Sequence, residues 1–182
     1  LTNYFTNLTK LSSGSYGKVY KANTTPLAKE EIGQDLPDIV AIKAIAKTSI
    51  RTEQLKKFLK DEIVIMRSID TEFTMKFYGC FESPNNIYII MELINGKDLL
   101  DLMNEIKLSA DDTKGIFAKL AQGISVLHTN KLLHRDLKPE NVMYDPSTKT
   151  LKIVDYGLSC LTNIPSGKDV GVCLGITPGT PG

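Results

Sequence analysis

The first half of the chain alternates between apolar runs and polar breaks in a pattern that is typical of β-strands. Residues 11–20 have apolar ends around a centre of small residues, which predicts two strands joined by a flexible turn. Residues 39–46 carry apolar side chains on both parities, so we expect a strand that is buried on both faces. Residues 73–81 and 87–91 predict two more strands. Residues 22–38 are polar and contain Pro and Gly, so we expect a long mobile connection there.

A helical stripe follows the strand predicted at residues 39–46. Between residues 55 and 69, apolar side chains recur every three or four positions, and Glu62 lies within this stripe. Lys43 lies in the middle of the strand that is predicted to be buried. An unpaired charge is costly both in this strand and in the apolar stripe of the helix. We therefore expect the Lys43 ammonium and the Glu62 carboxylate to pair with each other. The alternatives are that Lys43 extends to water, or that the pair has only a structural value.

The second half of the chain is mainly helical in pattern. Residues 97–105 predict a short helix, and a longer helix begins near Ser109, which can cap it ahead of two aspartates. The predicted core stripe of the longer helix consists of Ile116, Phe117, Leu120, Ile124 and Leu127. We expect His128, at the end of this helix, to pack as a structural residue. Short strand patterns follow at residues 142–144 and 151–154.

A polar loop separates the long helix from these two strands. Pro139 prevents the helix from continuing, so Asp136, Lys138 and Asn141 should lie on a rigid loop, where catalytic groups are common. Asp155 follows the strand at residues 151–154, which places a carboxylate at the mouth of a cleft, and such oxygen ligands suit Mg²⁺. The alternatives are a charged connecting loop for the first set and an ordinary turn residue for Asp155.

Gly14 and Gly17 lie in the turn predicted within residues 11–20. Because glycine lacks a Cβ, backbone N–H groups can approach an anion closely, which is how glycine-rich loops hold phosphates. A plain hairpin is the alternative explanation for this pair of residues.

Composition narrows the class of protein. The 182 residues, 42% hydrophobic and 24% charged, suit a globular protein of one domain or two small lobes. The net charge of +1 gives no electrostatic reason to expect a nucleic-acid or membrane partner. With only three cysteines and two histidines, a disulfide framework and a metal site of nitrogen and sulfur ligands are not expected. No apolar run reaches about 18 residues, and we expect a cytoplasmic location, with the nucleus as the alternative.

Several of these motifs together resemble those of eukaryotic protein kinases. Residues 132–141 read Leu-Leu-His-Arg-Asp-Leu-Lys-Pro-Glu-Asn, which is similar to the kinase catalytic loop in the form usual for the serine/threonine class. Val-Ala-Ile-Lys at residues 40–43, with Glu62, resembles the strand lysine and helix glutamate of the family. Residues 155–157 read Asp-Tyr-Gly where the family has Asp-Phe-Gly. The glycine-rich loop is matched by Gly14 and Gly17, although Ser12 replaces its first glycine.

The resemblance implies an α+β fold with two lobes. Residues 1–94 would form an N-terminal lobe with a five-stranded antiparallel sheet and one helix. Residues 95–182 would form part of a mainly helical C-terminal lobe, which stops after the activation segment. We therefore expect that this chain alone folds marginally, or that the natural protein continues beyond Gly182. The run at residues 151–159 is most similar to calcium/calmodulin-dependent kinase relatives.

The same resemblance implies a protein serine/threonine kinase, which transfers the γ-phosphoryl group of ATP to a protein hydroxyl. Asp136 would orient the acceptor hydroxyl and accept its proton, and Lys138 would steady the transferring group. Lys43, held by Glu62, would contact the ATP phosphates. Mg²⁺, with Mn²⁺ as the alternative, would be held by Asn141 and Asp155. The implied ATP-binding residues are Leu11, Gly14, Gly17, Val19, Ala41, Lys43, Met91, Glu92, Ile94 and Met143.

The implied partner is a protein or peptide with a serine or threonine acceptor. Asp98 and Glu140 stand where related kinases meet basic residues, which predicts a basic substrate. Thr180 matches a threonine that contacts the catalytic aspartate and lysine, and Arg135 matches an arginine that receives an activating phosphate. Ile176 stands where that phosphorylated residue often lies, which argues against activation by phosphorylation. The sequence does not predict an oligomeric state.

Other classes of protein remain as alternatives. A nucleotide-binding pseudokinase or scaffold usually lacks one of the catalytic polar residues, and none is missing here. An inactive fragment of a larger kinase would retain all of them. A small-molecule phosphotransferase of related fold is disfavoured by the Gly-Thr-Pro-Gly sequence at residues 179–182, and a P-loop NTPase by the lack of a Gly-Lys-Ser/Thr signature.

Overall fold

The computed structural model describes residues 1–14 and 17–162 of the chain. The chain forms two compact units: a first unit of Leu1–Lys57 with Lys76–Leu93, and a second unit of Phe58–Met75 with Ile94–Gly182. The lobe boundary expected at residue 94 stays a prediction. Two residues of the sequence analysis lie outside the described part of the chain. They are Thr180, expected to contact the catalytic aspartate and lysine, and Ile176, at the position of the activating phosphorylation.

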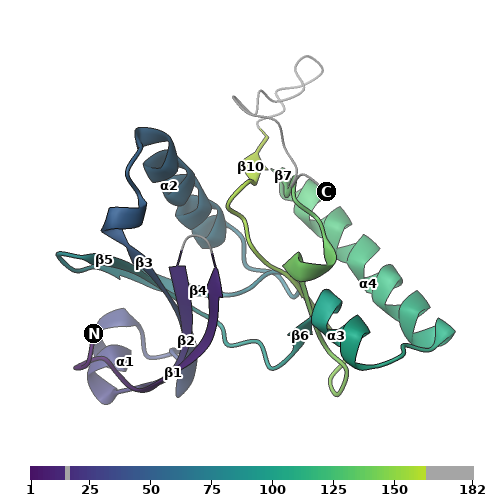
Figure 1. Cartoon of the computed structure of the whole chain (residues 1–182), viewed down its shortest axis with the longest axis horizontal. Helices are drawn as coiled ribbons and strands as arrows, with labels where there is room; N and C mark the ends of the chain where they lie inside the picture. The colour runs from purple at the N-terminus through teal and green to yellow at the C-terminus, as the bar shows by residue number, and fades with distance from the viewer. Residues whose placement is uncertain (15–16, 163–182) are drawn as a thin grey trace. The chain divides into compact units, whose positions relative to one another are not determined.

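A five-stranded antiparallel sheet in the order β1-β2-β3-β5-β4 forms the framework of the first unit (Figure 1). Its strands are β1 (Phe5–Gly14), β2 (Gly17–Thr24), β3 (Ile39–Ala46), β4 (Phe77–Glu82) and β5 (Asn86–Met91). β1 and β2 form the predicted hairpin, with Gly14 opposite Gly17 at its end. The five-stranded antiparallel sheet expected from the resemblance is therefore confirmed.

β3 is the central strand of this sheet and pairs with β2 on one side and β5 on the other. Val40 and Ile42 are fully buried, and Ala41, whose side chain points to the opposite face, is only 4% exposed. The prediction of a strand buried on both faces is confirmed. Val40 and Ile42 belong to a hydrophobic cluster whose other members are Phe5, Ala22, Ala28, Leu36 and Ile90.

The connection between β2 and β3, which was expected to be a long mobile segment, contains a helix, α1 (Pro26–Ile32), that the sequence analysis did not predict. Thr25 caps the helix, since its hydroxyl accepts a hydrogen bond from the Ala28 N–H at 3.3 Å. The helix ends at Gly33, whose N–H donates to the Lys29 carbonyl. Ala28 is fully buried and anchors α1 to the sheet. The sequence does contain features that are typical of helix ends: Thr25 followed by Pro26 at the beginning and Gly33 at the end. The helix was missed because the segment is polar.

After the 3₁₀-helix η1 (Lys47–Ser49), α2 (Glu53–Ser68) carries the predicted apolar stripe. Ile65 and Met66 are buried, and Glu62 is buried with them at 7% exposure. The expectation that a carboxylate lies within the apolar stripe is therefore confirmed.

The apolar pattern predicted a strand that starts at residue 73, but the structure has no strand there. The Phe73 carbonyl instead accepts a hydrogen bond of 2.8 Å from the Ile153 N–H, and the Thr74 carbonyl accepts one of 3.0 Å from Lys152 Nζ. The Phe73 ring also lies 3.2 Å from the position that a Cβ on Gly123 would occupy. These contacts within the second unit use the backbone of residues 73–74, and β4 begins only at residue 77.

The second unit combines helices with small sheets. Its other helices are α3 (Leu99–Glu105), α4 (Ala110–Thr129) and the 3₁₀-helix η2 (Pro139–Asn141). Its short strands are β6 (Lys97–Asp98), β7 (Leu132–Leu133), β8 (Val142–Asp145), β9 (Thr150–Ile153) and β10 (Cys160–Leu161). They form a β6-β8-β9 sheet and a β7-β10 pair. The predicted cap of α4 is confirmed, because the Ser109 hydroxyl accepts a hydrogen bond from the Asp112 N–H at 3.0 Å.

The buried face of α4 is narrower than predicted. Ile116, Gly123 and Leu127 are buried, but Phe117 is 65% exposed and His128 is also exposed. Each of the exposed residues follows a buried one and therefore projects about 100° away around the helix. The expectations that Phe117 and His128 pack in the core are wrong for the part of the chain that the structure describes.

The α+β class and the kinase-like combination of elements are confirmed by these two units. Within residues 1–14 and 17–162, none of the helices has the length and apolar character required to cross a membrane.

Candidate active site

The predicted polar loop connects β7 to β8 in the second unit. Pro139 opens η2, and the Asn141 N–H closes its turn by donating to the Lys138 carbonyl at 2.9 Å. The Asn141 side chain is 5% exposed, and the side chains of Asp136 and Lys138 are 11% and 28% exposed. The predicted loop therefore brings Asp136, Lys138 and Asn141 together, in a partly buried position between packed strands.

One oxygen of the Asp136 carboxylate is held by donors from the same loop. Lys138 Nζ lies 3.1 Å from Asp136 Oδ2, and Asn141 Nδ2 donates to the same oxygen at 3.1 Å. Asn141 Nδ2 also donates to the Asp136 backbone carbonyl at 2.8 Å. This arrangement fixes the orientation of the carboxylate. It can hold a hydroxyl group in a defined direction and accept its proton.

Asn141 also links the loop to the segment that carries Asp155. Because Asn141 Nδ2 faces Asp136, the amide oxygen of Asn141 is directed elsewhere. The backbone carbonyl of Asn141 accepts a hydrogen bond of 2.9 Å from the N–H of Val154, the residue before Asp155. Asp155 is exposed, and its Oδ1 accepts a weak hydrogen bond of 3.3 Å from the Gly157 N–H.

The oxygen atoms of Asn141 and Asp155 are the kind of ligands that Mg²⁺ prefers, with substrate phosphates completing the set. Among the described residues, no cluster of three or more His, Cys, Asp or Glu residues could hold a metal ion by itself. The donor set therefore fits a cation that arrives together with a phosphate ligand. It does not fit a cation enclosed entirely by protein.

Positive φ angles occur on both sides of the site. Arg135 has φ 66° and Asp155 has φ 64°, a region that residues other than glycine rarely adopt. Such a backbone costs about 1–3 kcal/mol, so the surrounding contacts must stabilise it. Arg135 Nε donates to the Leu158 carbonyl at 2.6 Å, and the Ser159 hydroxyl donates to the His134 carbonyl at 3.1 Å. These bonds tie the loop to the residues that follow Asp155.

His134 is a residue of the site that the sequence analysis did not single out. Its ring is 3% exposed, Nε2 lies 2.9 Å from the Val154 carbonyl, and Nδ1 accepts a hydrogen bond of 3.3 Å from the Asp136 N–H. This pattern requires a neutral ring with its proton on Nε2. Burial lowers the pKa of His134, which keeps the ring neutral. His134 thereby fixes the backbone of both Asp136 and the residue before Asp155.

Acidification should therefore destabilise the protein through His134. Since the folded-state pKa lies below the usual value of about 6.5, the unfolded chain takes up a proton first as the pH falls. Between about pH 7.5 and pH 5.5, the free energy of unfolding should decrease by up to about 1.4 kcal/mol per pH unit. Denaturant unfolding at several pH values measures this slope. The variant His134→Asn should show a flatter slope, and an unchanged slope would contradict the assignment.

Tyr156, which replaces the phenylalanine of the family motif, is buried at 2% exposure. Its hydroxyl donates to the Ile153 carbonyl at 2.6 Å, and its ring centroid lies 5.5 Å from that of His134. Burial raises the pKa of the Tyr156 hydroxyl, so it stays protonated as a donor. The Tyr156 hydroxyl, which a phenylalanine would lack, therefore has a hydrogen-bond acceptor within the same turn.

The first unit places Lys43 on one face of the sheet with other predicted ATP-binding residues. Val19 lies opposite Lys43 in the register, and Ala41 lies opposite Met91. Because cross-strand partners and residues two apart share a face, Val19, Ala41, Lys43 and Met91 all lie on the same side. Met91 is 5% exposed, whereas Lys43 is half-buried.

Pairing of Lys43 with Glu62 stays a prediction, since Lys43 belongs to the first unit and Glu62 to the second. Leu11 is 50% exposed on β1, and Met143 is half-buried on β8 opposite Asp98. Ile94 is the first residue of a second-unit segment and is half-buried. Their assignments to an adenine pocket also stay predictions.

Glu92 has a structural role that the sequence did not indicate. Its N–H donates to the Lys76 carbonyl at 2.9 Å, and its carboxylate accepts a hydrogen bond from the Lys76 N–H at 3.0 Å. These bonds fix the backbone where β5 ends, next to Met91. The Glu92 N–H is engaged, so its carbonyl is the backbone group of this residue that could contact adenine.

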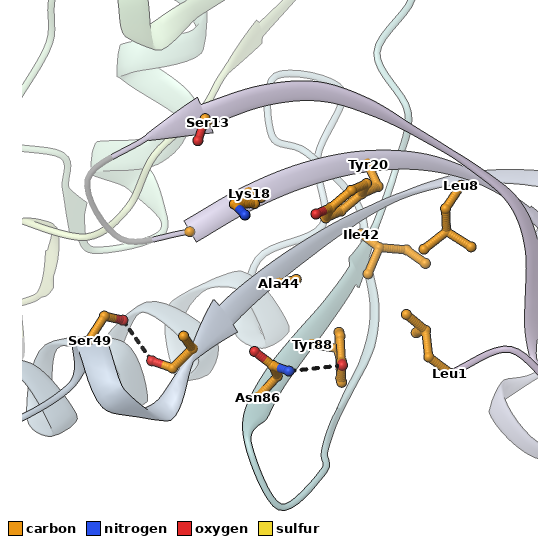
Figure 2. A pocket seen from close by; sticks show the side chains of 12 residues that line it. Leu1, Leu8, Ser13, Lys18, Tyr20, Ile42, Ala44, Ser49, Asn86 and Tyr88 are labelled. Carbon is orange, nitrogen blue, oxygen red and sulfur yellow. Dashed lines mark hydrogen bonds between the residues drawn. The ribbon is translucent and has the colours of Figure 1, made fainter.

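Figure 2 shows a separate hollow of about 430 Å³ on the sheet of the first unit. Tyr20, Ile42, Ala44 and Tyr88 contribute to its lining, and Ile42 and Ala44 alternate with Lys43 along β3. The hollow therefore lies on the other face from Val19, Ala41, Lys43 and Met91, although Gly17 at the end of the β1-β2 hairpin also contributes to its lining.

Gly17 has a packing role that supplements its predicted role near phosphate. A Cβ at Gly17 would lie only 2.6 Å from the Ala44 carbonyl oxygen, so β3 would have to move. We expect Gly17→Ala to reduce the free energy of unfolding by about 1–3 kcal/mol. Gly115→Ala is the matched control, because nothing lies within 4 Å of the added Cβ in α4. The control should be stabilising by up to about 1 kcal/mol, and equal effects of the two substitutions in denaturant unfolding would refute this account.

Comparison with known proteins identifies the family. The model of the protein kinase domain matches residues 5–174 of the chain. Human testis-specific serine/threonine-protein kinase 4 is 35% identical over 162 residues, which cover 88% of this chain and 46% of that protein. Human NUAK family SNF1-like kinase 2 is 36% identical over 155 residues, covering 85% of this chain and 23% of that protein. Yeast CDC5/MSD2, a cell cycle serine/threonine-protein kinase, is 32% identical over 144 residues.

The chain spans less than half the length of these curated relatives. The calcium/calmodulin-dependent subgroup stays a prediction, since the names of these relatives do not mention it. The family match covers nearly all of the chain and includes the loop of Asp136, Lys138 and Asn141. The chain therefore belongs to the protein kinase family, and its relatives place it in the eukaryotic serine/threonine class.

Proposed function

We propose that the protein transfers the γ-phosphoryl group of ATP to the hydroxyl group of a serine or threonine in a protein substrate. The observation that carries this proposal is the position of Asp136, whose carboxylate is fixed by Lys138 and Asn141. A fixed carboxylate of this kind is suited to a substrate hydroxyl that must be oriented before it attacks.

The reaction forms a bond between the substrate oxygen and the γ-phosphorus and breaks the bond between that phosphorus and the β,γ-bridging oxygen of ATP. Asp136 orients the hydroxyl and accepts its proton, and the departing ADP carries away the negative charge of the broken bond. Lys138 Nζ lies 3.1 Å from Asp136 Oδ2. Its positive charge would therefore lie beside the transferring phosphoryl group and stabilise it. Catalysis then rests mainly on positioning and on electrostatic stabilisation.

Asn141 and Asp155 are the residues that would hold Mg²⁺, with Mn²⁺ as the alternative cation. When bound, the cation neutralises phosphate charge. Asn141 is the better fixed of the two side chains, because both of its hydrogen bonds to Asp136 orient the amide.

In the first unit, the face with Val19, Ala41, Lys43 and Met91 is the proposed nucleotide-binding surface. Lys43 would contact the α- and β-phosphates while paired with Glu62, and the apolar residues would flank adenine. The hairpin end at Gly14 and Gly17 would cover the phosphates. Glu62 is buried on its helix, which supports a need for a cationic partner.

For substrate choice, we infer a basic peptide. Glu140 is exposed in the catalytic loop and could attract a basic side chain. Asp98 contributes less, because its Oδ1 already accepts a hydrogen bond of 2.8 Å from the Asp101 N–H.

A nucleic-acid or membrane partner is not part of the proposal, and the proposed location is the cytoplasm, with the nucleus as the alternative.

The test uses the full-length natural protein with γ-labelled ATP, Mg²⁺ and a peptide with one serine among basic residues. A second peptide with alanine in place of serine is the control. Label on the serine peptide alone is the expected result. Binding of ATP without label on either peptide would overturn the proposal in favour of a nucleotide-binding pseudokinase or scaffold.

A further inference from the structure

The residues around Asp155 form a turn that is anchored on its N-terminal side. The Ile153 N–H donates to the Phe73 carbonyl at 2.8 Å, and the Val154 N–H donates to the Asn141 carbonyl at 2.9 Å. The Val154 carbonyl lies 2.9 Å from His134 Nε2. The backbone that enters Asp155 is therefore held at consecutive residues, although Asp155 itself has the unfavourable φ of 64°.

On the C-terminal side, Tyr156 provides the anchor. Its ring packs against His134, and its hydroxyl returns to the Ile153 carbonyl at 2.6 Å, closing a loop of residues 153–156 around Asp155. The Tyr156 carbonyl in turn accepts a hydrogen bond of 3.0 Å from the Ser159 N–H. A phenylalanine at this position could keep the ring packing but would have no hydroxyl to close the loop.

We propose that the hydroxyl of Tyr156 is a positioning group for Asp155, which holds the carboxylate at its strained backbone angle ready to bind a divalent cation with a nucleotide. The inference rests on the proposed function for the role of Asp155 toward the cation. Tyr156 acts through Asp155 and does not itself contact the reacting atoms.

Geometry and chemistry both support this role. Buried hydrogen bonds between neutral groups contribute modestly to stability, but this one spans a residue with a positive φ. Relaxation of Asp155 toward a common φ would displace Tyr156 relative to Ile153 and break the bond. The hydroxyl therefore adds its stabilisation specifically to the backbone state that presents the carboxylate.

The first test is hydrogen exchange of backbone amides in the full-length natural protein without ligand. In Tyr156→Phe, the Gly157 and Ser159 amides should exchange about two- to tenfold faster, the range expected for one lost hydrogen bond. Tyr144→Phe is the matched control, since Tyr144 is a buried tyrosine of β8 in the same unit. Unchanged rates at these amides in Tyr156→Phe, or an equal increase throughout β8 and β9, would overturn the inference.

The second test is a Mg²⁺ titration with a non-hydrolysable ATP analogue. Tyr156→Phe should raise the Mg²⁺ concentration for half-maximal binding of the analogue about two- to tenfold, and Tyr144→Phe should not. A merely structural hydroxyl would lower the melting temperature and leave this titration unchanged, which would overturn the inference. Neither test requires turnover, so absence of phosphoryl transfer in the natural protein would count against the proposed function alone.

Discussion

Replacement of Asp136 by asparagine should lower the rate constant of phosphoryl transfer by about 10²–10⁴-fold, while the affinity for ATP changes by no more than about twofold. Asparagine has nearly the same shape, and its amide oxygen can still accept the hydrogen bonds that Lys138 and Asn141 donate. It cannot accept a proton from the substrate hydroxyl. The measurements are single-turnover transfer to a serine peptide and equilibrium binding of an ATP analogue.

Asp111→Asn is the matched control for this experiment, because Asp111 is exposed in the first turn of α4. It should retain full transfer activity. Undiminished transfer by the Asp136 variant would exclude Asp136 as the proton acceptor. An equal loss in both variants would point to damage of the second unit as a whole.

Replacement of Lys43 by methionine should lower kcat/KM for ATP by about 10²–10³-fold, which is the typical effect of removing one charged or hydrogen-bonding group that acts on a transition state. Methionine keeps the length and the apolar part of the side chain, so the packing of β3 should survive. Steady-state kinetics at varied ATP concentration measures the effect, and thermal unfolding monitors the fold.

Lys18→Met is the appropriate control, since Lys18 is exposed on β2 opposite Ala44 and points to the other face of the sheet. It removes the same charge from the same sheet but should leave kcat/KM for ATP within about twofold. If both lysine variants lost activity equally, the effect would reflect the net charge of the first unit and not the position of Lys43.

Much of the fold could be predicted because its signals are local and periodic. The apolar run of residues 39–46 predicted the doubly buried β3, and the position of Glu62 within an apolar stripe predicted its burial. The chemistry of the loop also followed from local sequence. Pro139 ends the helical pattern, and the polar residues around it lie close enough in the chain for one turn to bring them together.

The features that were missed depend on contacts between distant segments. Residue 73 looked like the start of a strand, but the Phe73 carbonyl bonds to Ile153, which lies 80 positions further along the chain. His134 has no pattern that distinguishes it from other loop residues, and its role follows from hydrogen bonds that reach Val154. The helix α1 is a different case, because its cap and stop were visible at Thr25 and Gly33.

The nucleotide-binding part of the proposed function depends on the prediction that Lys43 and Glu62 act together as one ion pair on bound ATP. The most direct measurement is a double-mutant cycle of MgATP affinity with the wild type, Lys43→Met, Glu62→Gln and the double variant. We predict a coupling energy of about 1–3 kcal/mol between the two substitutions. The affinity of the double variant for MgATP should then be nearly the same as that of the single variant with the lower affinity. Additive effects of the two substitutions, or no effect of either on the affinity for MgATP, would contradict the account.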